Sequence, residues 1–241
     1  MRHNTNIEFQ RARFDKINNY YGKKCGLPPS FSQIRIEETL INGQGVYDIN
    51  LKKEILKAWE KNMKRNDLFV VTHLGVFLAI HQNAKPGVET LLPYAFSGGG
   101  DVELPSFDTL DINALYNGSL KMETGNVVNL DDFPLAVFKK VPQKQPSIIA
   151  LDDGEGSTVG NLAQPAFDLL ELCHPMAEEI TLAGTQDHKI TISFPTFPTS
   201  NYGSGAGNES KLVFIALGYK VTGGTGEKYK NDAANPYAGA I

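Results

Sequence analysis

The residue types that most often bind zinc or act as nucleophile and base are present, but their spacing forms no known motif. The chain has five histidines and two cysteines, with no HxH or HExxH pattern and with Cys25 and Cys173 far apart. His73 and His81 lie in a long apolar segment, which favours a packing role for both. Ser157 lacks the G-x-S-x-G surroundings of a nucleophile elbow. We therefore predict no zinc site, no cofactor and no enzymatic turnover.

One acidic segment has side chains that suit a hard cation. Asp152, Asp153 and Glu155 fall within four residues, and calcium prefers oxygen ligands of this kind. The segment lacks the D-x-[DN]-x-[DN]-G order of a calcium loop, so these residues are weak metal candidates and we predict no bound metal. Carboxylates can also meet only after folding, since the spacing that glycoside hydrolysis requires is three-dimensional. A β-rich hydrolase is therefore kept as the least favoured alternative.

Two apolar segments near the end of the chain predict the strands around which the fold is built. In residues 188–194, Ile190, Ile192 and Phe194 alternate with polar residues, which is typical of a strand with one buried face. Residues 211–222 begin with seven positions that are almost all apolar, as in a strand covered on both faces. A glycine-, serine- and asparagine-rich segment separates the two. We expect them to form an antiparallel hairpin at the centre of a sheet.

Other segments predict further strands and turns. Residues 67–81 carry almost no charge and predict a long buried strand, or two strands joined by a bulge at Gly75. Asn117-Gly118 and Thr124-Gly125-Asn126 predict hairpin turns. With 23 glycines and 13 prolines, this pattern predicts a mainly β protein, an antiparallel β-sandwich.

Two or three short helices are expected beside the strands. One is predicted over residues 52–65, with Trp59 on its apolar face, and another over residues 165–173. The predicted core combines Trp59 with the buried faces of the strands. Its other members are Phe69, Val71, Ile190, Ile192, Phe194, Leu212, Val213, Phe214 and Ile215.

The beginning of the chain differs in charge from the rest. Residues 1–24 contain six basic and two acidic residues, a net charge of +4, which leaves −8 for the remainder because the total is −4. We divide the chain into a basic arm with a Pro-rich linker (1–30), a β-sandwich body (31–222) and a polar C-terminal tail (223–241). The arm is expected to pack on a neighbouring subunit or to contact nucleic acid or another acidic surface, and a solvated amphipathic helix is the alternative. Its predicted contact residues are Phe9, Arg11, Arg13, Phe14, Lys16 and Ile17.

Two classes of segment are not found in the sequence. The first residues include no apolar stretch of the kind found in a secretory signal. No apolar run approaches the roughly 20 residues that span a bilayer. The expectation is a protein made in the cytoplasm, without a signal peptide or transmembrane segment.

Four segments together resemble the structural proteins of bacterial viruses with jelly-roll capsid folds. They are residues 115–120, 129–142, 188–197 and 211–221. The likeness is one of layout and extends loosely over residues 31–222: a basic arm, short strands with glycine-rich insertions, a Phe-Pro-rich strand end and an apolar closing strand. It implies a jelly-roll sandwich, either single with insertions or a compact tandem pair. It also implies a capsid shell or spike component located in the virion.

The function expected from this resemblance is subunit contact within a virion, through self-association and contacts with other virion proteins. A β-sandwich that binds a ligand, for example a carbohydrate, has the same strand pattern and is the main alternative. The two differ in their size in solution, because a shell protein forms large regular assemblies.

Overall fold

The computed structural model describes residues 2–24, 26–41, 43–51, 61–82, 90–92, 116–139, 149–152, 158–161, 169–195 and 208–225. In chain order the elements are α1 (Arg2–Ile17), η1 (a π-helical segment, Asn18–Lys24), β1 (Ser30–Thr39), β2 (Val46–Asn50), β3 (Leu68–Gln82), β4 (Thr90–Leu92), β5 (Ser119–Thr124), β6 (Val127–Pro134), η2 (a 3-10 helix, Leu135–Phe138), β7 (Ile149–Asp152), β8 (Thr158–Asn161), α3 (Leu169–Leu172), β9 (His174–Ala183), β10 (His188–Ser193) and β11 (Asn208–Val221).

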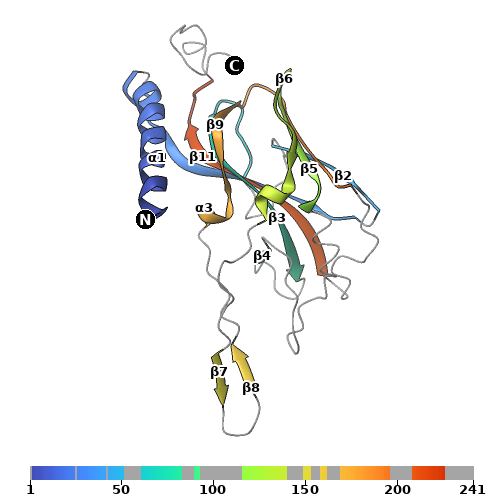
Figure 1. Ribbon diagram of the computed structural model, residues 1–241. Coiled ribbons are helices and arrows are strands. Elements are labelled where there is room, and N and C mark those ends of the chain that lie inside the picture. Colours follow the sequence, from blue (N-terminus) through green and yellow to red (C-terminus); the bar gives the residue numbers. More distant parts are fainter. Residues whose placement is uncertain are drawn as a thin grey trace.

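Two antiparallel sheets make up the body of the protein (Figure 1). The first sheet has the order β1-β11-β3-β4, and β9 pairs with β3 on the same side as β4. The second has the order β2-β10-β5-β6. One apolar core contains side chains of both sheets, among them Ile36, Phe214, Ile190 and Met122. The predicted β-sandwich architecture agrees with this arrangement of two sheets around a shared core.

Burial along the strands follows the patterns of the sequence. In β10, Ile190 and Ile192 are fully buried and alternate with partly or fully exposed residues. In β11, every residue from Lys211 to Gly218 is buried, as expected for a strand covered on both faces. Nine of the ten predicted core residues are buried, and the tenth, Trp59, lies outside the described residues.

The predicted hairpin between β10 and β11 is wrong. β10 lies in the second sheet between β2 and β5, whereas β11 lies in the first sheet between β1 and β3. The physical reason is visible in the two patterns: the second sheet has one solvent-exposed face and takes the alternating strand. The first sheet is covered on both faces and takes the wholly apolar strand.

β3 is one continuous strand, and its irregularity is not at Gly75. The pairing of β3 with β9 shifts between Val71 and His73. Gly75 is needed for space instead, because a Cβ atom there would lie 2.5 Å from the ring of Phe77 and 2.9 Å from the Sγ atom of Cys173. A missing side chain in a strand indicates either a bulge or close packing, and here it is close packing.

The helix predicted over residues 52–65 is wrong for its described part. Lys61 forms a β-bridge with Arg35, and the N–H of Met63 donates to the carbonyl of Leu51, so this segment is extended. Residues 52–60 lie outside the described residues. The four-residue helix α3 falls within the predicted segment 165–173. No helix of the described residues is long and apolar enough to cross a membrane.

The turn predicted at residues 124–126 is confirmed. β5 and β6 form a hairpin, and Gly125 at its turn has a φ of 56°, in the left-handed region that glycine adopts readily. Asn117-Gly118 directly precedes β5, and the residues before Tyr116 lie outside the described part. A second hairpin, β7–β8, lies apart from the two sheets in Figure 1.

The outer face of the first sheet is covered by two apolar clusters. In one, Ile17, Tyr20 and Tyr21 of α1 and η1 pack on Leu68 and Val70. The second joins buried residues of β3 and β11 to α3 and the segment that follows it, and its members are Phe77, Ala79, Leu172, Cys173, Val213, Ile215 and Leu217. Helix, first sheet and second sheet therefore form three layers.

Candidate functional site

The irregular pairing of β9 with β3 leaves backbone groups without ladder partners. Pro175 pairs with His73 and Ile180 pairs with Val71, so four residues of β9 lie opposite Thr72 alone. A bulge of this kind interrupts the ladder and bends the strand. Because buried carbonyl groups need hydrogen-bond donors, this part of the first sheet requires donors from elsewhere in the chain.

Arg13 of α1 supplies those donors. Its Nη1 donates to the carbonyl of Thr72 at 3.2 Å, and its Nη2 donates to the carbonyls of Met176 and, at 3.3 Å, Ala177. The Nε atom lies 3.9 Å from a carboxylate oxygen of Glu179. Arg13 is 6% exposed although it carries a full charge. The planar guanidinium group has five N–H donors in a fixed fork, which suits several carbonyls at once.

Neighbouring arm residues also contact the body of the same chain. Lys16 donates to Glu179 at 2.6 Å, and Ile17 is completely buried. Phe14 is half-buried, with its ring centroid 5.5 Å from that of Tyr219. Arg11 is exposed on the helix. We call α1 together with its contacts on β3, β9 and β11 the helix seat.

The structure therefore brings together four of the six predicted arm residues, Arg13, Phe14, Lys16 and Ile17, on one surface of the chain itself. The side chain of Phe9 lies outside the described residues. A contact of the arm with another subunit stays a prediction. It has to use exposed residues such as Arg11, because Ile17 and Arg13 are already buried against the sheet.

His73 lies beside the helix seat in an apolar environment. Burial is the main cause that lowers the pKa of His73 to about 4, and the charges of Arg13 and His174 lower it further. The Nδ1 atom is 2.9 Å from the hydroxyl of Thr72, and that hydroxyl donates to the carbonyl of Leu217 at 3.2 Å. Because a hydroxyl has one proton to donate, the neutral His73 carries its proton on Nδ1 and donates to Thr72.

The weak metal candidates lie outside what the structure describes. Asp153 and Glu155 fall in the segment between β7 and β8, and the side chain of Asp152 is likewise outside the description. Among the described residues, no group of three or more histidine, cysteine, aspartate or glutamate side chains could hold a metal ion.

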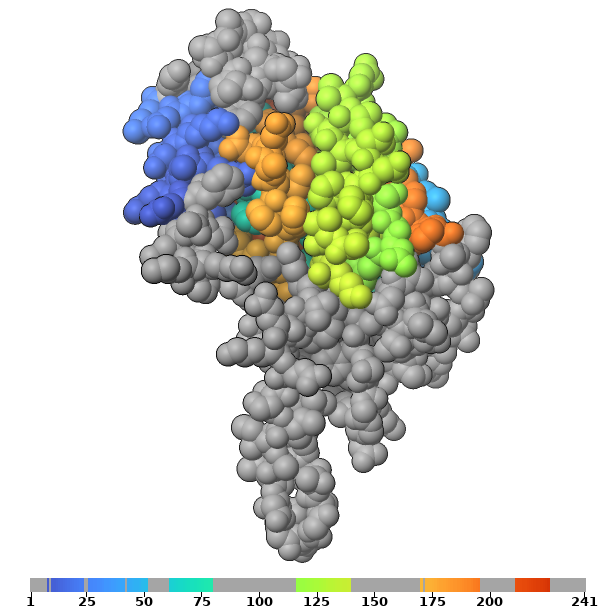
Figure 2. All heavy atoms as spheres, viewed as in Figure 1, coloured from blue at the N-terminus to red at the C-terminus, as the bar shows by residue number. Residues whose placement is uncertain are grey.

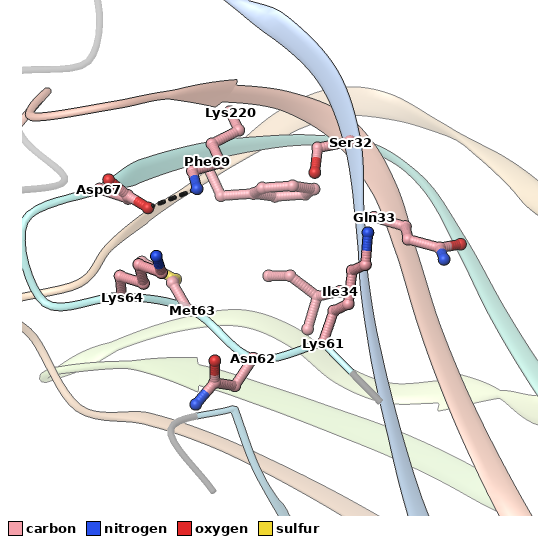
Figure 3. Close-up of a pocket in the computed structure, with 10 residues that line it drawn as sticks. All are labelled: Ser32, Gln33, Ile34, Lys61, Asn62, Met63, Lys64, Asp67, Phe69 and Lys220. Carbon is pink, nitrogen blue, oxygen red and sulfur yellow. Dashed lines mark ion pairs between the residues drawn. The ribbon is translucent and has the colours of Figure 1, made fainter. Parts of the chain in front are cut away.

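A second site is a pocket at the edge of the first sheet, with a volume of about 360 Å³ (Figure 3). It lies where the segment 61–64 departs from β1 after the bridge between Arg35 and Lys61. Ile34, Met63 and Phe69 give it an apolar lining, and Figure 3 shows the side chains of Ile34 and Phe69 directed toward the hollow. We call this site the lysine pocket, after the three lysines described next.

Lysine side chains surround the lysine pocket. Lys61, Lys64 and Lys220 line it together with one carboxylate, Asp67. Lys220 is held by Asp67 at 2.8 Å. Lys61 and Lys64 are exposed and form no ion pair with any other residue that the structure describes. The pocket therefore has a local charge of +2, from three lysines and one aspartate, on a chain whose total charge is −4.

Sequence reasoning found the arm residues but missed their partners and the pocket. The partners of Arg13 are backbone carbonyls, which have no signature in side-chain types, and Met176 is 163 residues away. The lysine pocket takes its residues from β1, the segment 61–67, β3 and β11. The one available signal is the high lysine content of residues 52–64.

Comparison with known proteins adds no identity to these sites. No protein-family model, curated protein or solved structure matches the chain. The function is therefore argued from the fold and the two sites.

Proposed function

We propose that the protein is a structural subunit of a virus particle, a shell or spike component that acts through contacts between subunits. The observation that carries the proposal is the order of the strands. Eight strands make the two facing sheets: β1, β2, β3, β5, β6, β9, β10 and β11. If these eight strands are numbered 1 to 8 in chain order, the strand order is 1-8-3-6 in the first sheet and 2-7-4-5 in the second. The short strand β4 is left out of this numbering and lies beside β3.

This order supports a single jelly roll. Strand 1 pairs with strand 8, 2 with 7, 3 with 6 and 4 with 5. Each strand counted from the start of the chain is therefore paired with the strand at the same position counted from the end. A long hairpin of strands that wraps into two facing sheets produces these pairings, and viral capsid proteins are among the proteins built in this way. Strands from both ends of the body enter one sandwich, which favours the single over the tandem form.

The edges of the sandwich support association between copies. Among the described residues, the large exposed apolar side chains lie on edge strands or beside them: Phe31 on β1, Ile41 after β1, Val46 on β2, and Val127 and Val128 on β6. β1 and β2 are edge strands, and β6 is the edge strand at the other end of the second sheet. The edge formed by β1 and β2 and the edge formed by β6 carry different apolar residues, which suits a head-to-tail contact between copies. Such a contact generates a ring when its rotation closes.

The test measures the size of the particles that the 241-residue protein forms, in solution and by electron microscopy. We expect light scattering and negative-stain microscopy to find rings or closed shells, and we expect Val127→Lys with Val128→Lys to reduce the protein to monomers without lowering its melting temperature. The matched control is Lys189→Ala on the exposed face of the second sheet, which should leave assembly unchanged.

Two results would count against the proposal. A protein that stays monomeric at all concentrations and salt conditions has no shell-forming contact. A monomer whose melting temperature rises with a particular glycan is instead a ligand-binding β-sandwich, the alternative with the same strand pattern.

A further inference from the structure

We propose that the lysine pocket binds a phosphate group that is part of a larger organic molecule, a nucleic-acid strand or a free nucleotide. The pocket is complete within one chain, so this binding activity goes beyond the proposed role in assembly and does not depend on it. It also moves the expected anionic contact from the basic arm to the body of the protein.

Two of the six basic residues of the arm, Arg13 and Lys16, are engaged within the chain. Arg13 is buried against backbone carbonyls, and Lys16 is paired with Glu179. Lys61 and Lys64, by contrast, are exposed and have no ion-pair partner among the described residues. An exposed lysine without an ion-pair partner can bind an anion without first breaking an internal contact. Because Lys61 and Lys64 line one pocket together with Lys220, the pocket is a better anion site than the surface around Arg13 and Lys16.

The donor groups favour a phosphate over a carboxylate. The cationic groups of the pocket are all ammonium groups, which act as compact point charges and commonly bind phosphate. Figure 3 shows Lys61 extending along β1 and the hydroxyl of Ser32 directed toward the same hollow. A phosphate monoester offers three acceptor oxygens and up to two negative charges, and each phosphodiester of a strand offers two unbridged oxygens and one charge. Either can therefore use several of these donors at once.

The apolar lining favours a phosphate that carries an organic body. A volume of about 360 Å³ is within the size range of pockets that hold small molecules and exceeds the need of a lone ion. Ile34, Met63 and the ring of Phe69 provide apolar contact for a sugar or a base.

The experiment measures binding of a fluorescently labelled 20-residue oligothymidylate to the full-length protein by anisotropy, at several salt concentrations. The test variant is Lys61→Ala with Lys64→Ala. Both side chains are exposed, so the variant is expected to fold, with its melting temperature as the check. The matched control is Lys121→Ala with Lys189→Ala, which removes the same charge from β5 and β10 in the second sheet.

We expect the pocket variant to bind about tenfold more weakly. The slope of log K against log salt should fall by about 1.4 if each lysine contacts one phosphate of a single strand. The control should keep the affinity and slope of the original protein. Equal weakening in both variants, or no weakening in the pocket variant, would overturn the proposal, because binding would then follow net charge or use another surface.

Competition with the labelled oligonucleotide distinguishes a free nucleotide from a nucleic-acid strand as the ligand. Displacement of the oligonucleotide by thymidine monophosphate supports the proposal with a free nucleotide as ligand. Lysine-dependent binding that the monophosphate does not displace supports it with the strand as ligand. Displacement by polyglutamate at the same charge concentration contradicts it, since the pocket would then bind acidic peptides. Particle size measured without nucleic acid tests the proposed assembly independently of this result.

Discussion

At the scale of single residues, the guanidinium group of Arg13 connects the N-terminal helix to the bulge between β3 and β9. Replacing it by alanine leaves the carbonyls of Thr72 and Met176 without their donor in a buried position, and that of Ala177 without its donor in a partly buried one. We expect Arg13→Ala to lower the free energy of unfolding by about 2–4 kcal/mol, because buried polar groups that lose a charged partner are strongly destabilising. Urea denaturation followed by circular dichroism measures the change.

Two variants of the same helix serve as controls for Arg13. Arg11→Ala removes an equal charge from an exposed position and should change stability by less than about 0.5 kcal/mol. Arg13→Lys keeps the charge but lacks the planar fork, so it should give an intermediate loss. If Arg11→Ala and Arg13→Ala cost the same, the effect is one of net charge and the hydrogen bonds to the bulge contribute nothing.

His73 makes stability depend on pH in a defined direction. Its pKa is lowered to about 4 in the folded protein, compared with about 6.5 in the unfolded chain. Between these two values the unfolded chain binds a proton that the folded protein does not, so stability rises with pH. This contribution is fully present above pH 6.5 and is lost as the pH falls toward 4. Denaturation at a series of pH values should show the decline.

His73→Asn isolates this residue from other titrating groups. Asparagine keeps a hydrogen-bond donor for the hydroxyl of Thr72 and does not titrate. The stability difference between the two proteins should be constant above pH 7 and should shift in favour of the variant as the pH falls below 6.5. A difference that stays constant over the whole range would show that His73 titrates alike in both states.

At the scale of elements, α1 and η1 form part of the folded body. Ile17, Tyr20 and Tyr21 are buried, and burial of a large apolar side chain contributes roughly 1.5–3 kcal/mol. An arm separate from the body, as in the division made from the sequence, would be removable without a change in the melting temperature. We now expect deletion of residues 1–24 to lower the melting temperature markedly and to expose Leu68, Val70 and other residues of the first sheet to solvent. Thermal melting followed by circular dichroism is the measurement.

A synthetic peptide of residues 1–24 provides the matched addition experiment. The truncated protein keeps the residues of β3, β9 and β11 that α1 contacts. The peptide should therefore bind there and raise the melting temperature of the truncated protein. A peptide with Arg13→Ala should do so less. If truncation leaves melting unchanged, the helix contributes no stability and the original division into arm and body is right.

The elements themselves were largely predictable from the sequence, but their neighbours were not. The alternation of β10 and the apolar content of β11 reveal which faces are buried, because side chains alternate along a strand. Neither pattern says which strand lies beside them, and so the hairpin was mispredicted. The helix seat is less predictable still, since the carbonyls that Arg13 contacts become free only when β9 bulges away from β3.

At the scale of the whole molecule, the lysine pocket illustrates the same difficulty. Ser32, Lys64 and Lys220 are far apart in the chain and meet only because β1 pairs with β11 and the segment 61–64 diverges from β1. Any one of these lysines is ordinary surface charge in the sequence. Long-range strand pairing is what turns them into a site, and local propensity carries no information about it.

The pairing of the first strand with the last also has a consequence for biosynthesis. Ser30 of β1 contacts Lys220 of β11 across 190 residues. At about 5–20 residues per second, a ribosome needs roughly 10–40 seconds to synthesise that interval. During this time β1 and β3 have emerged and both lack the strand that lies between them in the first sheet. The nascent chain therefore presents unpaired, apolar strands until β11 has been synthesised, and exposed strands of this kind are segments that chaperones bind.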